Sequence, residues 1–333
     1  MQRRVQIVVR LGVLGLAAAV SGCGDNIYDP FTSLVRVSGH SPFDPGCIGT
    51  QRGMNFAGVE VEPSVAVDPT NPAHLVGVWQ QDRWSNGGSN GIGAAASFGG
   101  GATWKPSTLR FGRCGGGSAA SGTDYDRATD PWVTIAADGT VFLVALVFDS
   151  TSPRNAMLAS RSTDGGVTWS DPAVLRADSD PDVFNDKDTI TADATDPGRV
   201  YAVWDRLTGQ SQPTRPIGTG PTWFARTTAG VWEPARPIFD PGVDAQTIGN
   251  VIGVLPDGTL INAFDLITMV SSTAPVTMLA VIRSPDRGLT WSAPVVIAPM
   301  RGVGIQDPNN HVFIRSGLDL PEIAVDRTRP PTR

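Results

Sequence analysis

The sequence STDGGVTW at residues 162–169 recurs as SPDRGLTW at residues 284–291, and this repeat decides the fold. A looser copy, SFGGGATW, spans residues 97–104, and a shorter one, TTAGVW, spans residues 227–232. Four tryptophans close these copies at intervals of 65, 63 and 59 residues: Trp104, Trp169, Trp232 and Trp291. Such regular self-similarity is typical of repeat architectures, in which each copy belongs to one structural unit.

The chemistry of the motif explains why it repeats. Asp followed by Gly forms a tight turn, because the carboxylate accepts backbone N–H bonds and glycine tolerates positive φ. The Thr-Trp pair then opens the next strand, where both residue types are favoured. We expect each Trp to be buried against a neighbouring unit, where truncation to alanine would cost about 3–5 kcal/mol. The motif residues are therefore predicted to be structural rather than catalytic: Asp164, Gly166, Trp169, Asp286, Gly288 and Trp291.

Residues 131–176 predict one four-stranded antiparallel unit. Strands are expected at 132–136 and 157–162, and a further strand begins at Trp169. Between them VFLVALVF, residues 141–148, is apolar without alternation, which indicates a strand buried on both faces. Four antiparallel strands, one of them covered on both sides, are typical of a propeller blade.

The same order of strands recurs along the chain and begins a fifth time at residues 321–326. The sequence therefore predicts an all-β fold, a β-propeller with four complete four-stranded blades plus the start of a fifth. Because closing the ring stabilises a propeller, we expect an incomplete ring in a truncated chain. The alternative is a ring closed from four blades, to which residues 31–37 or 321–325 lend a strand.

The first 22 residues have the features of a lipoprotein signal peptide. Arginines flank a short apolar run at residues 11–20, which is too short to span a membrane. The following VSGC resembles a bacterial lipobox, which implies cleavage before Cys23 and lipidation of its thiol. The alternative is an ordinary secretory signal with an incidental cysteine.

This signal predicts the organisation and location of the mature chain. We expect residues 23–58 to form a lipid-anchored tether and residues 59–333 to form the propeller. Acyl chains on Cys23 would hold the protein to a membrane of the bacterial cell envelope. Gly24, the residue after this cysteine, favours the outer membrane or cell surface.

Cysteine usage and composition agree with export. In an oxidising compartment Cys47 and Cys114 could form one disulfide, and two free thiols are the alternative. Charged residues make up only 17% of the chain, while 38 Gly and 27 Pro indicate many turns. The formal net charge of −6 argues against a nucleic-acid partner, which would require a basic face.

The Ser-x-Asp-x-Gly-x-Thr-Trp phrases resemble the Asp-box (BNR) repeats of sialidases and related β-propeller proteins. The likeness covers residues 60–326 and implies a sialidase-type propeller, here an incomplete six-bladed ring. Asp boxes are specific for the fold and weak for the activity, because propellers without sialidase activity also contain them.

Sialidases of this family bind the substrate carboxylate with three arginines and use an Asp acid/base and a Tyr–Glu nucleophile pair. Where the first arginine belongs, this chain has Glu62, which would repel a carboxylate; Arg83 could match the second. The segment 84–88 lacks the acid/base Asp, and none of Tyr28, Tyr125 and Tyr201 lies in a late blade. We therefore assign no catalytic residues and expect no sialidase turnover.

Two charged clusters precede inner strands and are expected to meet at the mouth of the propeller. They lie at residues 124–130 and 186–188, and arginines follow the second strands of two units. Carboxylates and cations together could bind a sugar, and carboxylates with backbone carbonyls would suit Ca²⁺. The alternative is a set of loop ion pairs and turn caps. The candidate ligand-binding residues are Arg83, Asp126, Arg127, Asp130, Asp186, Lys187, Asp188 and Arg206.

No other cofactor is predicted. His40, His74 and His311 have no Cys or carboxylate at ligand spacing, so a zinc site is not expected. Three functions follow from the sequence. The first is a surface-anchored, sialidase-like propeller that binds a glycan or another surface polymer. The second is a glycoside hydrolase whose late blades are missing, and the third is a protein-interaction scaffold.

Overall fold

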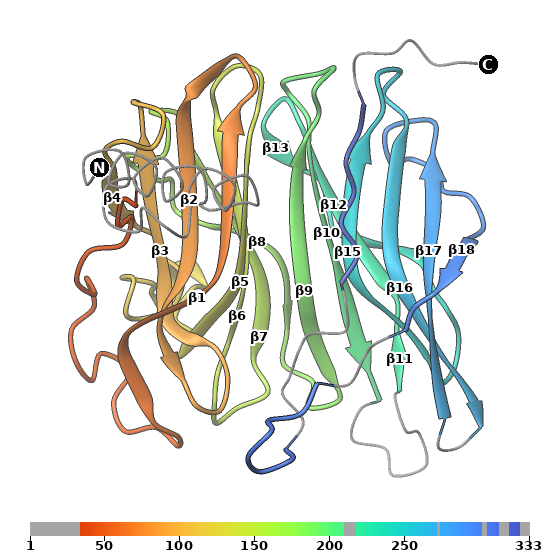
Figure 1. Ribbon diagram of the computed structural model, residues 1–333, viewed down its shortest axis with the longest axis horizontal. Helices are drawn as coiled ribbons and strands as arrows, with labels where there is room; N and C mark the ends of the chain where they lie inside the picture. The colour runs from red at the N-terminus through yellow and green to blue at the C-terminus, as the bar shows by residue number, and fades with distance from the viewer. Residues whose placement is uncertain (1–33, 210–217, 272–273, 302–304, 313–319, 327–333) are drawn as a thin grey trace, which may run out of the picture. The chain divides into compact units, whose positions relative to one another are not determined.

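Four groups of antiparallel strands follow one another in the computed structural model, which describes residues 34–209, 218–271, 274–301, 305–312 and 320–326 (Figure 1). The first blade contains β1 (Asn55–Asp68), β2 (Asn71–Trp84), β3 (Ser89–Ser97) and β4 (Lys105–Thr108). The second contains β5 (Arg127–Ile135), β6 (Val141–Phe148), β7 (Asn155–Ser162) and β8 (Ala173–Asp178). The short 3₁₀ helix η1 (Ala119–Ser121) precedes β5.

The third and fourth blades repeat this order. The third contains β9 (Val183–Ala192), β10 (Val200–Thr208), β12 (Thr222–Thr228) and β14 (Arg236–Phe239), with the short β11 (Thr219–Gly220) and β13 (Val231–Trp232). The fourth contains β15 (Ala245–Val254), β16 (Leu260–Ser271), β17 (Ala274–Ser284) and β18 (Val295–Pro299). The predicted four-stranded blades are thus confirmed, although β1 and β5 begin several residues earlier than expected.

The hydrophobic core lies between adjacent blades, and β6 shows why its sequence has no alternation. Val141, Leu143, Ala145 and Val147 pack with residues of the first blade such as Val76 and Ile92. Phe142, Val144 and Leu146 pack with residues of the third blade such as Ile190 and Val200. Successive side chains of a strand point to opposite faces, so β6 is apolar throughout because both of its faces are covered.

The Asp-box turn is held together by its own side chains. Asp164 Oδ1 accepts hydrogen bonds from the Thr168 N–H (2.9 Å) and the Ser162 hydroxyl (2.7 Å). Thr168 Oγ1 donates to Asp164 Oδ2 at 2.6 Å, and the Gly166 N–H donates to Ser162 Oγ at 2.8 Å. Although burial opposes the shift, these bonds lower the pKa of Asp164 to about 2. Asp286 has the same arrangement in the fourth blade, so the motif is structural as predicted.

Each of these turns packs onto the preceding blade. The Trp169 ring N–H donates to Ser107 Oγ of the first blade at 3.0 Å. The Trp291 ring meets Phe224 of the third blade edge to face, with centroids 5.6 Å apart. The prediction that these tryptophans are buried is only partly right, because both are half-buried. They cover the edge of the core between two blades and do not lie within it.

Gly166→Ala is expected to destabilise the protein by roughly 2 kcal/mol, since φ is +91° there and a Cβ would lie 2.9 Å from Val76 Cγ2. Gly242→Ala is the matched control, because Gly242 has the same φ and nothing lies within 4 Å of its Cβ position. Urea unfolding should show the larger loss for Gly166→Ala. Equal losses would mean that crowding of the new Cβ against Val76 of the first blade adds nothing to the loss of stability.

Residues 320–326 lie against the inner strand of the fourth blade, where a fifth blade would begin. A Cβ on Gly249 would come 2.8 Å from Leu320 Cδ2, and one on Gly253 would come 3.0 Å from Ile323 Cδ1. The segment has the predicted position, but it is not assigned to a strand.

The folded unit begins earlier than the sequence suggests. Residues from Val37 onward belong to the same compact unit as the propeller, and Phe43 and Ile48 are buried. The part of the expected tether at residues 37–58 therefore packs against the blades. The predicted signal peptide, Cys23 and the start of the tether lie outside the described residues. Within the described part of the chain, no helix is both long and apolar enough to cross a membrane.

Candidate functional site

The four inner strands, β1, β5, β9 and β15, share an irregularity at the same place. Each has a bulge near its middle, and a residue in the left-handed region lies at that bulge. These residues have φ between 40° and 68° and are Glu62, Asp130, Lys187 and Gly249. The bulges interrupt strand pairing near the middle of the inner strands, and we call the surface around these four residues the mouth.

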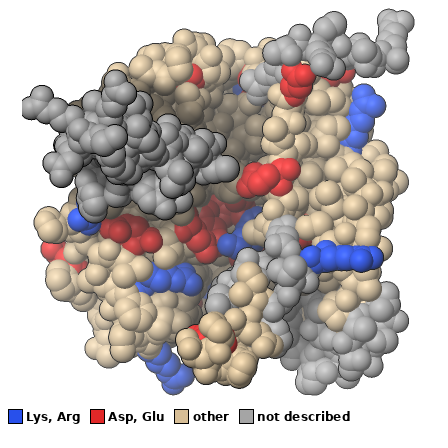
Figure 2. Space-filling model, in the orientation of Figure 1, with Lys and Arg blue, Asp and Glu red and all other residues tan. Residues whose placement is uncertain are grey.

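A pocket of about 230 Å³ lies at the mouth. The charged side chains come from β1, β5 and β9 and from Glu322, and the apolar groups come from β1, β5 and β15 and from Leu320 and Pro321. Figure 2 shows acidic side chains gathered around a basic one near the hollow in the middle of this face. The pocket is lined by Glu62, Pro63, Asp130, Pro131, Trp132, Lys187, Asp188, Thr189, Gly249, Val251, Leu320, Pro321 and Glu322.

An ion cluster joins the first three inner strands. The Lys187 ammonium contacts the Asp130 carboxylate and lies 3.6 Å from Glu62 Oε2. Gln80 Nε2 donates to Glu62 Oε2 at 2.6 Å and to Thr129 Oγ1 at 2.8 Å. Thr129 Oγ1 in turn donates to Asp130 Oδ2 at 2.9 Å. Side chains from β1, β2, β5 and β9 therefore hold the charged groups of the pocket in place.

The two carboxylates of this cluster titrate in opposite directions. Burial, together with the hydrogen bond and negative charge of Asp130, raises the pKa of Glu62 to about 7, although Lys187 and Arg83 oppose the shift. Burial works against ionisation of Asp130 too, but its bonds to Glu62 and Lys187 lower its pKa. A proton shared by the pair thus resides on Glu62, and Asp130 remains the carboxylate.

Two more carboxyl groups lie close to this cluster and are almost fully buried. Asp188 lines the pocket, and Asp205 on β10 pairs in register with Asp186. Neither Asp188 nor Asp205 accepts a hydrogen bond from another described residue. Burial raises the pKa of both groups well above the ordinary value.

The structure brings only some of the predicted site residues together. Asp130, Lys187 and Asp188 line the pocket, and Asp186 lies beside it. Arg83 does not line the pocket. Its Nη1 donates to Gln80 Oε1 at 3.0 Å and to the Gly88 carbonyl at 3.3 Å.

Three predicted residues do not line the pocket and are engaged elsewhere. Asp126 forms an ion pair with Arg113. Arg127 is buried, with its guanidinium 3.7 Å from the Trp84 ring centroid, and burial lowers its pKa to about 10. Arg206 forms a bidentate pair with Asp178 at 2.7 and 2.9 Å. The partners Arg113 and Asp178 come from other segments, so the local sequence does not reveal these pairs.

Glu62 and Trp132 are among the lining residues that sequence reasoning missed. Glu62 was considered only as a residue that would repel a carboxylate, and Trp132 only as the start of a strand. A signal for both exists, because a residue followed by proline occurs at the bulges 62–63 and 130–131. Proline lacks an N–H and suits a place where the strand ladder is interrupted.

The expectation of calcium finds no support in the cluster. Within the described ranges, no group of three or more His, Cys, Asp and Glu side chains is arranged to hold a metal ion. The carboxylates that Ca²⁺ would need already surround the Lys187 ammonium.

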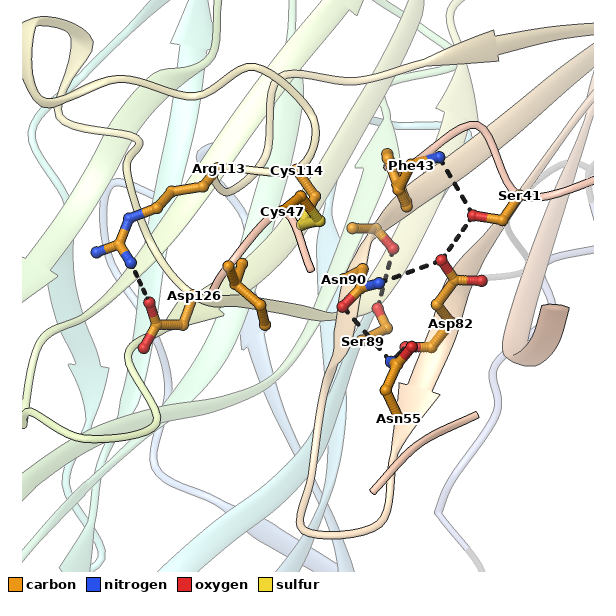
Figure 3. Close-up of a disulfide and its surroundings, with 12 residues drawn as sticks. Ser41, Phe43, Cys47, Asn55, Asp82, Ser89, Asn90, Arg113, Cys114 and Asp126 are labelled. Atoms are coloured by element: carbon orange, nitrogen blue, oxygen red, sulfur yellow. Dashed lines mark hydrogen bonds and ion pairs between the residues drawn. A yellow bond between two sulfur atoms is a disulfide. The ribbon is translucent and has the colours of Figure 1, made fainter. Parts of the chain in front are cut away.

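The Cys47–Cys114 disulfide lies apart from the pocket residues and ties the N-terminal segment to the loop before β5 (Figure 3). The two Cα atoms are 5.2 Å apart. The same segment is anchored at Ser41, whose hydroxyl donates to Asp82 Oδ2 at 2.6 Å. The Gly58 N–H donates to Oδ1 of the same carboxylate at 2.8 Å. The pairing expected from the cysteine count is therefore present in the structure.

No family model matches the chain, and no curated protein matches it. Solved structures match at low identity. An α-L-arabinofuranosidase of Fusarium graminearum, in complex with an iminosugar inhibitor, has 14% identity and a TM-score of 0.52 over 76% of this chain and 68% of that chain. An α-L-arabinanase of Penicillium chrysogenum, in complex with arabinobiose, has 14% identity and a TM-score of 0.50 over 72% of this chain and 66% of that chain.

A protein of unknown function from Dyadobacter fermentans is similar to the same degree, with 16% identity and a TM-score of 0.50 over 71% of this chain and 68% of that chain. This chain spans about two thirds of the length of these structures. It is an all-β protein with a sialidase-type β-propeller fold. Its propeller resembles those of glycoside hydrolases.

Proposed function

We propose that this propeller binds a carbohydrate at its mouth and does not hydrolyse it. The observation that supports this most directly is the mixed charged and apolar lining of the pocket. Carboxylates and an ammonium face the pocket from Glu62, Asp130 and Lys187, and Trp132 and Leu320 supply apolar surface. Saccharides have a hydroxyl edge and an apolar C–H face, so such a lining is complementary to them.

The spacing of the carboxylates argues against hydrolysis. Glycosidases place two carboxyl groups about 5–9.5 Å apart so that the anomeric carbon, or a water, fits between them. Glu62 and Asp130 are instead close enough to share a proton, and Lys187 bridges them. The Lys187 ammonium thus occupies the place between these two carboxylates.

Glycoside hydrolysis is the second candidate, and one property favours it. A carboxyl group whose pKa is about 7, such as that of Glu62, can act as a general acid near neutral pH. If the wild type released reducing ends from arabino-oligosaccharides and Glu62→Gln did not, the protein would be a glycoside hydrolase. This result would overturn the proposal that it only binds saccharides.

Trp132→Ala is expected to weaken saccharide binding at least about tenfold, because the variant loses the aromatic surface of the pocket. Isothermal titration with arabinobiose and with a panel of other neutral oligosaccharides measures this loss. Trp104→Ala is the matched control, since Trp104 is a half-buried Asp-box tryptophan that does not line the pocket. Equal affinity of Trp132→Ala and the wild type would contradict the proposed site.

A further inference from the structure

At the mouth, each of the four inner strands has a bulge with a left-handed residue, and the type of this residue differs from strand to strand. The left-handed residue of the bulge is Glu62 in β1, Asp130 in β5, Lys187 in β9 and Gly249 in β15. Positive φ is uncommon for residues other than glycine, so its recurrence indicates a conserved shape of the bulge within this molecule. Because the backbone repeats and the side chains do not, these positions can set specificity.

We infer that these bulge positions make the mouth selective for an uncharged saccharide end, whose hydroxyls meet Glu62, Asp130 and Lys187 and whose C–H face meets the apolar side at Gly249 and Leu320. This inference rests on the proposed function. It adds that saccharides bearing carboxylate or sulfate groups are rejected.

The charged side has unused hydrogen-bonding capacity. The Lys187 side chain is 20% exposed and that of Glu62 is 38% exposed, so both can reach a ligand. Each carboxylate oxygen can accept more than one hydrogen bond, and the ammonium has three donors. Sugar hydroxyls both donate and accept, and they would be satisfied by this mixed set.

The apolar side owes its shape to the absence of a side chain at Gly249. A Cβ there would come 2.8 Å from Leu320 Cδ2 and 3.1 Å from Pro321 Cδ. Glycine at this bulge lets Leu320 and Pro321 close that side of the pocket. Their carbon atoms, with those of Val251 and Trp132, form the surface on which a C–H face could lie.

The balance of charge carries the selectivity. Glu62, Asp130 and Glu322 line the pocket, and Lys187 is the one cation among the described lining residues. This ammonium is already paired with Asp130. Arg83 lies behind the lining, where Gln80 and the Gly88 carbonyl bind its Nη1. An acidic saccharide would therefore place its charge beside carboxylates, without a free cation to compensate it.

Matched neutral and acidic ligands test this selectivity. Isothermal titration of the full chain would use two pairs: lactose with 3′-sialyllactose, and methyl-esterified trigalacturonate with free trigalacturonate. In any pair whose neutral member binds, we expect the acidic member to bind at least about tenfold more weakly. Arabinobiose serves as a further neutral probe, and its acidic counterpart is an arabinobiose oxidised to the aldonate.

Two charge variants complete the experiment. In the double variant Glu62→Gln/Asp130→Asn, we expect the discrimination to fall below about threefold, because the variant removes the negative charge of Asp130 and the charge that Glu62 carries above its pKa of about 7. Glu60→Gln is the control, since Glu60 is on the same strand and does not line the pocket. Circular dichroism checks that both variants fold.

The outcomes separate the inference from the function on which it rests. Equal or tighter binding of the acidic members, or unchanged discrimination in a folded double variant, overturns the inference and leaves saccharide binding in place. Failure of every probe to bind the folded wild type overturns both. Weaker binding of the acidic members, lost in the double variant and retained in Glu60→Gln, supports both.

Discussion

Replacing both bridged cysteines, as Cys47→Ala/Cys114→Ala, is expected to lower the free energy of unfolding by roughly 4 kcal/mol. The disulfide closes a loop with a sequence separation of 67 residues, and cross-linking a loop of this length removes much conformational entropy from the unfolded chain. Urea unfolding followed by circular dichroism measures the loss. The double variant avoids leaving an unpaired thiol.

The same double variant shows whether the loss of stability arises in the unfolded state or in the folded state. Phe43 and Ile48, near Cys47, are buried, and the Ser41 hydroxyl is bound to Asp82, so the segment has contacts of its own (Figure 3). If the bridge acts mainly on the unfolded state, the tryptophan fluorescence of the folded variant should match that of the wild type. Unchanged stability of the double variant would contradict a structural role for the disulfide.

Lys187→Met is expected to cost about 3 kcal/mol at pH 8 and about 1 kcal/mol at pH 5. The variant keeps the apolar stem and removes the charge that compensates Asp130 and Glu62. Breaking an ion pair at this depth leaves charges without a partner in a poorly solvated place. Asp186, Asp188 and Asp205 surround the same position, and none of them can replace the ammonium.

The sign of this pH dependence follows from linkage. Lys187 lowers the pKa of both Asp130 and Glu62, so both pKa values are higher in the folded variant than in the folded wild type. Folding then favours the protonated groups, so their contribution is fully present at low pH. It is lost as the pH rises through the raised folded pKa values. The cost of the substitution must therefore grow between pH 5 and pH 8.

Lys105→Met controls for the loss of a positive charge in general. It removes the other lysine of the chain, which is exposed on β4. Its stability should stay close to that of the wild type at both pH values. If Lys187→Met lost the same free energy of unfolding at pH 5 and at pH 8, Lys187 would stabilise the fold through packing and not through its charge.

The fold could be predicted because its signals are local. Asp164, Gly166 and Thr168 make their turn from contacts within a few residues, so the phrase is visible in the sequence. The unbroken apolar run of β6 likewise shows that both of its faces are covered. The half-burial of Trp169 was not predictable, because it depends on how closely the preceding blade approaches.

The site was predicted less completely because its geometry depends on bulges and distant partners. Asp130, Lys187 and Asp188 were found because charged clusters recur before inner strands. Glu62 was missed because only the left-handed bulge places it beside Asp130 and Lys187. Asp126 and Arg206 do not line the pocket, and charge alone does not show that Arg113 and Asp178 bind them.

The central claim is that the mouth pocket binds a saccharide, and a crystal structure of the protein soaked with arabinobiose tests it most directly. The account predicts density for the sugar between Trp132 and the carboxylates of Glu62 and Asp130, with Lys187 in hydrogen-bond contact. Other neutral disaccharides serve the same purpose if they bind more tightly in solution. An ordered saccharide at any other place, with the mouth empty, would contradict the account.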